Sequence, residues 1–121
     1  MNDLEGKVAI VTGAGGRKGI GRAIATRLAQ EGAKLVVSDV VEIPYIDGEW
    51  EGVNSVVKDI ESLGGQGISI IADVSNAKSV QNLIDQTLRV YGRIDILVNN
   101  AGAIAGNDRV PVVSLKEADW D

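Results

Sequence analysis

This 121-residue sequence contains no cysteine and no histidine, and aromatic residues make up only 3% of it. Without cysteine, neither a disulfide framework nor a thiolate metal site can form. Without histidine, the chain lacks the commonest general base and the commonest metal ligand. We therefore assign no metal-ligating residue and look elsewhere for the chemistry.

Basic residues are also fewer than acidic residues. Twelve Lys and Arg residues face 17 Asp and Glu residues, which gives a formal net charge of −5. No basic stripe interleaved with aromatics is present, so nucleic-acid binding is disfavoured. The first residues, Met-Asn-Asp-Leu-Glu, are unlike a signal peptide, and no apolar run approaches the length of a membrane span. We expect one globular domain in the cytoplasm, with no membrane partner.

Short apolar runs alternate with amphipathic stretches along the chain. The runs predict strands at about 7–12, 34–39, 67–72 and 94–99, and the stretches predict helices at about 19–31, 51–63 and 76–91. This alternation is typical of a parallel sheet with crossover helices. Right-handed crossovers then predict a doubly wound α/β sheet with strand order 3-2-1-4. The first two helices should cover one face and the third helix the other.

Local signals mark where these helices begin and end. Ser75 is expected to cap the third helix. Gly32, Gly64 and Gly92 follow the last apolar positions of the three helices and are expected to end them.

The first predicted strand runs directly into a glycine-rich turn. Residues 12–21 read Thr-Gly-Ala-Gly-Gly-Arg-Lys-Gly-Ile-Gly, and the second strand ends on Asp39. Glycines let the backbone approach a pyrophosphate, and a helix start offers N–H groups and the positive end of its dipole. A carboxylate at Asp39 can accept both hydroxyl hydrogens of an adenosine ribose. The pattern predicts a dinucleotide site, with a turn whose glycines serve geometry alone as the alternative.

The glycine spacing separates this turn from two common motifs. Five residues lie between Gly13 and Gly19, so the turn is not of the G-x-G-x-x-G form. A P-loop also fits poorly, because Lys18 stands where that motif requires glycine.

Three motifs in order resemble the short-chain dehydrogenase/reductase family. Residues 12–21 resemble its cofactor turn, although the family usually has three residues, not five, between the first two glycines. Residues 72–75, Ala-Asp-Val-Ser, resemble its adenine-contacting strand end, and residues 99–102, Asn-Asn-Ala-Gly, resemble the segment after its fourth strand. The resemblance implies a Rossmann-type cofactor-binding half-domain over residues 1–121, incomplete relative to the family.

The resemblance also implies a role for each matched position. Those that would line the pyrophosphate and the nicotinamide ribose are Gly13, Gly19, Ile20 and Gly21, with Gly15 and Lys18 in the same turn. Asp39 would hold the adenosine ribose, and Asp73 and Val74 would contact the adenine. Those that would border the ribose beside the fourth strand are Asn99, Ala101 and Gly102, whereas Asn100 would brace the sheet.

Two charged residues bear on the choice of cofactor. Asp39 favours NAD, because a carboxylate accepts from free ribose hydroxyls and repels a 2′-phosphate. Lys18 points the other way, because the resemblance implies that some family members with a basic residue before this glycine use NADP. We expect NAD, with NADP as the less favoured alternative.

The family's catalytic tyrosine, followed by lysine four residues later, has no counterpart in these residues. Tyr45 and Tyr91 are the two tyrosines, and Glu49 and Asp95 stand at that spacing. We therefore assign no catalytic residue and expect the 121-residue chain to be inactive by itself.

The leading interpretation is an NAD(P)-dependent oxidoreductase that transfers a hydride between nicotinamide and an alcohol or carbonyl substrate, with this segment binding the cofactor. The alternative is a non-catalytic nucleotide-binding fragment or pseudoenzyme module that acts through a partner. A Rossmann-type methyltransferase is less favoured, because it does not account for residues 99–102. An open edge at the fourth strand and a partly covered apolar face predict self-association, hence a homo-oligomer.

Overall fold

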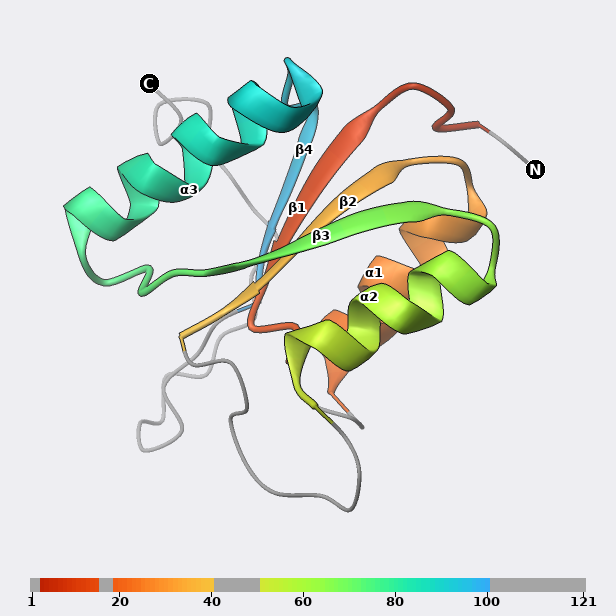
Figure 1. Ribbon diagram of the computed structural model, residues 1–121, viewed down its shortest axis with the longest axis horizontal. Coiled ribbons are helices and arrows are strands. Elements are labelled where there is room, and N and C mark those ends of the chain that lie inside the picture. Colours follow the sequence, from red (N-terminus) through yellow and green to blue (C-terminus); the bar gives the residue numbers. More distant parts are fainter. Residues whose placement is uncertain (1–2, 16–18, 41–50, 101–121) are drawn as a thin grey trace.

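The computed structural model describes residues 3–15, 19–40 and 51–100 (Figure 1). The elements in this part of the chain are β1 (Val8–Thr12), α1 (Ile20–Gln30), β2 (Lys34–Asp39), α2 (Val53–Ser62), β3 (Gln66–Ile71), α3 (Ala77–Tyr91) and β4 (Ile96–Asn99). The strands form one parallel sheet in the order β3-β2-β1-β4. The predicted doubly wound fold and strand order are confirmed.

The helices cover both faces of this sheet, as predicted (Figure 1). Alternate residues of a strand point to opposite faces. Ala9 and Val11 of β1 accordingly pack in the cluster that contains α1 and α2 residues, whereas Ile10 packs in the cluster that contains Leu83 of α3. Because both faces of β1 are buried, its sequence is an unbroken apolar run rather than an alternating one.

Glycines end the helices where the sequence predicts. Gly92 has a φ of 79° at the end of α3, and its N–H donates to the Leu88 carbonyl. Gly32 and Gly64, which follow α1 and α2, have φ values of 101° and 86°. The left-handed region that these values occupy costs little for glycine.

The predicted cap of α3 is wrong by one residue. The Asn76 side chain accepts the Ser79 N–H at 3.0 Å, so Asn76 is the cap. Ser75 instead donates its N–H and its hydroxyl to the Asp73 carboxylate. The Ser75 side chain is thus turned toward Asp73, in the turn before the helix, and the helix begins one residue later than the sequence predicts.

Among the described residues, β4 pairs with β1 alone and forms one edge of the sheet. On α3, Leu88 and Val90 are 44% and 54% exposed. The open edge is thus present in this part of the chain, and self-association stays a prediction. As far as the described segments extend, each helix is too short or too polar to cross a lipid bilayer.

Candidate functional site

The candidate site lies where the carboxyl ends of β1, β2 and β4 meet. The chain leaves β1 through the turn at Gly13 and Gly15, leaves β2 at Asp39 and leaves β4 at Asn99. From β1 the chain continues to β2, which pairs with one side of β1, whereas β4 pairs with the other side of β1. In open α/β sheets this reversal of strand order opens the crevice where ligands bind.

Asp39 contacts the glycine-rich turn through its carboxylate. One oxygen, Oδ2, accepts the Gly15 N–H at 2.9 Å, and the other, Oδ1, accepts the Val40 N–H at 2.8 Å. The turn is also joined to β2 by the backbone, since the Ala14 N–H donates to the Ser38 carbonyl at 2.9 Å. The sequence predicted Asp39 at the tip of the second strand, but it did not predict that the carboxylate would accept from the backbone of the turn.

The start of α1 is packed tightly against this turn at Gly21. A Cβ atom on Gly21 would lie 2.6 Å from the Gly13 carbonyl oxygen and 2.9 Å from the Asn100 side-chain nitrogen. Gly13 itself has a φ of 66°, in the left-handed region. Gly21 is buried and therefore has a packing role, in addition to the ligand-lining role that the sequence predicts for it.

Among the residues that the structure describes, no side chain caps the start of α1, in contrast to α3. The residue before the helix is Gly19, in an extended conformation with φ −80° and ψ 159°, and the first turn carries no acidic side chain. Such an end suits an anion, because the N–H groups and the helix dipole attract negative charge. Ile20, the first helical residue, is 64% exposed beside it.

The end of β4 is braced against the turn by polar contacts. The Asn100 side-chain amide donates to the Gly13 carbonyl at 3.2 Å, and its backbone N–H donates to the Thr12 hydroxyl at 3.1 Å. The Thr12 hydroxyl lies 3.0 Å from the Asn99 Oδ1, to which it can donate. The bracing role expected for Asn100 is confirmed. Sequence reasoning missed Thr12, whose only signal is a hydroxyl at the end of an apolar strand.

Asp73 and Val74 follow β3, which neighbours β2. Asp39 and this segment are joined by the Ala72 N–H, which donates to the Asp39 carbonyl at 3.0 Å. The pKa of the Asp73 carboxyl lies below its usual 3.8, first because of the Ser75 hydroxyl and then because of the Ser75 N–H. Val74 is 37% exposed. Both residues are thus placed beside the strand that ends in Asp39.

Three of the predicted site residues, Lys18, Ala101 and Gly102, lie outside the described residues.

Tyr91 lies near the amino end of β2, away from the candidate site, and its hydroxyl donates to the Leu35 carbonyl at 3.4 Å. Burial raises the pKa of the Tyr91 hydroxyl above its usual 10.0. Tyr91 is therefore a packing residue, in keeping with the absence of a catalytic assignment.

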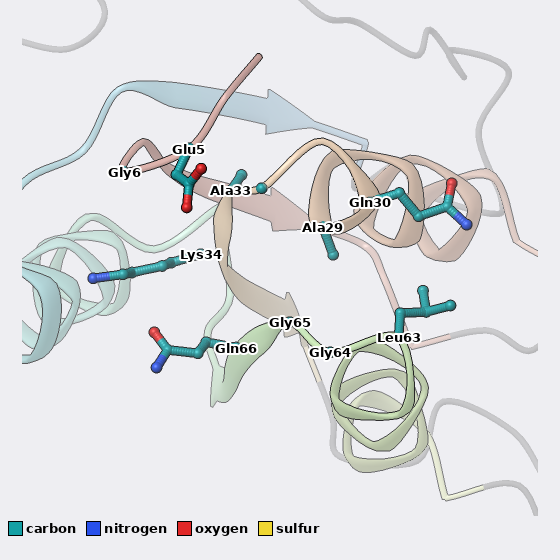
Figure 2. A pocket seen from close by; sticks show the side chains of 11 residues that line it. Glu5, Gly6, Ala29, Gln30, Ala33, Lys34, Leu63, Gly64, Gly65 and Gln66 are labelled. Atoms are coloured by element: carbon teal, nitrogen blue, oxygen red, sulfur yellow. The ribbon is translucent and has the colours of Figure 1, made fainter. Parts of the chain in front are cut away.

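A cavity of about 440 Å³ lies at the amino ends of β2 and β3. Figure 2 shows Glu5, Lys34 and Gln66 around it, together with Gly64 and Gly65, which follow α2. This edge is opposite to the one where parallel α/β sheets bind their ligands. The cavity is therefore separate from the candidate site.

Comparison with known proteins gives one consistent result. The family model described as short chain dehydrogenase matches residues 7–121. An uncharacterized oxidoreductase from Methylorubrum extorquens is 45% identical over 102 residues, which are 84% of this chain and 38% of that protein. A 3-oxoacyl-(acyl-carrier-protein) reductase from Thermotoga maritima is 37% identical over 118 residues, which are 98% of this chain and 43% of that protein.

Solved structures agree with these relatives. A 7α-hydroxysteroid dehydrogenase in complex with NADH and 7-oxo glycochenodeoxycholic acid superposes with a TM-score of 0.71 at 41% identity, covering 83% of this chain and 35% of that one. The chain thus spans less than half the length of the proteins it matches, and it corresponds to their N-terminal part. By its motifs, its strand order and these relatives, the chain belongs to the short-chain dehydrogenase family.

Proposed function

We propose that this chain binds NAD at the carboxyl edge of its sheet, as the cofactor-binding part of an oxidoreductase. The observation that carries the proposal is the position of the glycine-rich turn between Asp39 and the start of α1. The turn meets the helix end that suits an anion, and a carboxylate stands at the tip of the next strand. A related structure contains NADH, which supports the same assignment.

The residues present suit a dinucleotide. Gly21 lets the start of α1 lie directly against the turn at Gly13, and Gly19, the residue before the helix, has no side chain that could cap it. We propose that the pyrophosphate lies over this end, that Asp39 accepts from the adenosine ribose, and that Asp73 and Val74 contact the adenine. Gly15, Asn99 and the residues outside the described part would complete the site.

The bound nicotinamide would supply the hydride chemistry, between its ring and an alcohol or carbonyl carbon. The part of this chain is to bind and orient the cofactor. Substrate contacts and the proton donor are assigned to no residue here, because neither tyrosine of the sequence has a lysine four residues later.

The preference for NAD over NADP is tested by titrating the chain with NADH and NADPH and following the nicotinamide fluorescence. A carboxylate at Asp39 should repel a 2′-phosphate, so NADH should bind more tightly. Tighter binding of NADPH would overturn the preference, and failure of both to bind would overturn the proposed site.

A second candidate function is a nucleotide-binding module without turnover. It is favoured by the same observation that Tyr45 and Tyr91 are followed by Glu49 and Asp95 at the catalytic spacing. We expect the 121-residue chain to show no NAD-dependent oxidation on a panel of alcohols. Steady turnover by the chain alone would exclude this second function. The cytoplasmic location and the homo-oligomeric state remain predictions from the sequence.

A further inference from the structure

The carboxylate of Asp39 is engaged on both oxygens by the backbone. Oδ2 accepts from Gly15 in the turn after β1, and Oδ1 accepts from Val40 at the end of β2. Hydrogen bonds to an ionised acceptor are about twice as strong as neutral ones. Asp39 therefore fixes the direction of a peptide group in the very turn over which the pyrophosphate would lie.

A carboxylate can do this and still bind a ribose. Each carboxylate oxygen accepts more than one hydrogen bond, so contacts to Gly15 and Val40 leave room for hydroxyl donors. Asp39 is only half-buried, so a ligand can reach it. The residue thus faces two parts of the site, the adenosine ribose on one side and the turn on the other.

We propose that Asp39 is a positioning residue for the glycine-rich turn, and that this carboxylate couples the adenosine end of the site to the phosphate end. The inference rests on the proposed function and deepens it. It differs from a direct-contact role, in which Asp39 would matter only to ligands that carry the adenosine ribose.

A ligand without adenosine separates the two roles. Reduced nicotinamide mononucleotide retains the nicotinamide, its ribose and one phosphate, and it can be followed by its fluorescence. Under the proposal, Asp39→Ala weakens binding of this mononucleotide by about tenfold, the loss expected for one charge-assisted hydrogen bond. Unchanged affinity for the mononucleotide, with weakened affinity for NADH, would overturn the proposal in favour of direct contact.

The hydrogen bond from the Gly15 N–H to the Asp39 carboxylate, called the tether below, is also tested without any ligand. The measurement is hydrogen exchange at the Gly15 amide. Exchange at Gly15 should be faster in Asp39→Ala than in the parent chain, and Asp39→Asn, which keeps one acceptor oxygen, should restore part of the protection. Asp85→Ala is the matched control, because the Asp85 carboxylate accepts from Gln81 on the exposed side of α3. If Asp39→Ala does not fold, Asp39→Leu removes both acceptors while it keeps the size of the side chain.

The two experiments distinguish failure of the inference from failure of the proposed function. Unchanged exchange at Gly15 would overturn the tether even if NADH binds as expected. Failure of the parent chain to bind NADH would overturn the proposed function, whatever the exchange at Gly15 shows.

Discussion

Asp95 and Val8 exchange two hydrogen bonds between the segment before β4 and the first residue of β1. The Asp95 carboxylate accepts the Val8 N–H at 2.9 Å, and the Asp95 N–H donates to the Val8 carbonyl at 2.9 Å. Arg93 holds the same carboxylate at 2.8 Å. This pair fixes the start of β4 beside β1 at the amino edge, and therefore the register in which β4 delivers Asn99 and Asn100 to the site.

The Asp95 contacts predict a pH dependence of stability. The pKa of this carboxyl lies below its usual 3.8, first because of the hydrogen bond from Arg93 and also because of the Val8 N–H. The charged form is thus stabilised by folding. Its contribution is fully present above the unfolded pKa and is lost as the pH falls through the folded pKa. Denaturant unfolding of the parent and Asp95→Asn should show a difference in stability that shrinks over that range.

Arg93→Met provides the matched background for this experiment. Because Arg93 is the largest cause of the shift, Asp95→Asn should change the stability less in that background. Arg93 is 53% exposed, so solvent screening keeps the pair's energy small and salt should reduce it further. A difference in stability that does not vary with pH would contradict this account.

Gly21→Ala tests the packing of α1 against the turn. The new methyl group would meet the Gly13 carbonyl oxygen at 2.6 Å, which is backbone and must move. We expect a loss of about 1–3 kcal/mol in the free energy of unfolding, the usual cost of overpacking. NADH affinity should fall as well, since the turn shifts. Gln30→Ala, at the exposed end of the same helix, should change stability by less than about 0.5 kcal/mol.

Thr12→Val tests the brace between β1 and β4. Valine has nearly the same shape, but it leaves the Asn100 N–H without the acceptor it has at 3.1 Å. We expect a loss of about 1–3 kcal/mol in stability and faster hydrogen exchange at the Asn100 amide. Thr12→Ser keeps the hydroxyl and should leave that amide protected. Equal exchange in the two variants would show that the hydroxyl is not the acceptor.

Asn76→Ala tests the observed cap of α3. Loss of the acceptor for the Ser79 N–H should destabilise the protein by about 1 kcal/mol. Ser75→Ala, the position that the sequence pattern favours, should cost less, because Ser75 bonds the exposed Asp73 carboxylate instead. Thermal unfolding of the two variants decides between the caps. A larger loss of stability for Ser75→Ala than for Asn76→Ala would identify Ser75 as the cap.

Asp39→Ala with NADH as the ligand tests whether this carboxylate contributes to cofactor binding, which both the ribose contact and the contact to the turn require. A polar partner left unmet costs about 1–3 kcal/mol, and we expect NADH binding to weaken by that amount. Fluorescence titration measures it. Unchanged NADH affinity would place the ribose away from Asp39.

The elements, their order in the sheet and the face that each helix covers could be predicted from the amino-acid sequence. Hydrophobic periodicity and helix-ending glycines are local signals, so the stop at Gly92 and the place of Asp39 at a strand tip could be predicted. The order 3-2-1-4 followed from the handedness of the crossovers between parallel strands. Boundaries shifted by one or two residues: β4 begins at Ile96 rather than 94, and α2 begins at Val53 rather than 51.

The polar pairs between distant segments, in contrast, are set by the assembled fold. Asp39 and Gly15 are 24 residues apart, and Asn100 and Gly13 are 87 apart, and both pairs form hydrogen bonds. The packing role of Gly21 likewise depends on Gly13 and on Asn100, which directly follows β4. No local sequence pattern predicts such pairs. The two residues of each pair meet only after the parallel strands have brought their carboxyl ends to one edge of the sheet. Periodicity sets where a strand lies, whereas the assembled register sets what its last side chain binds.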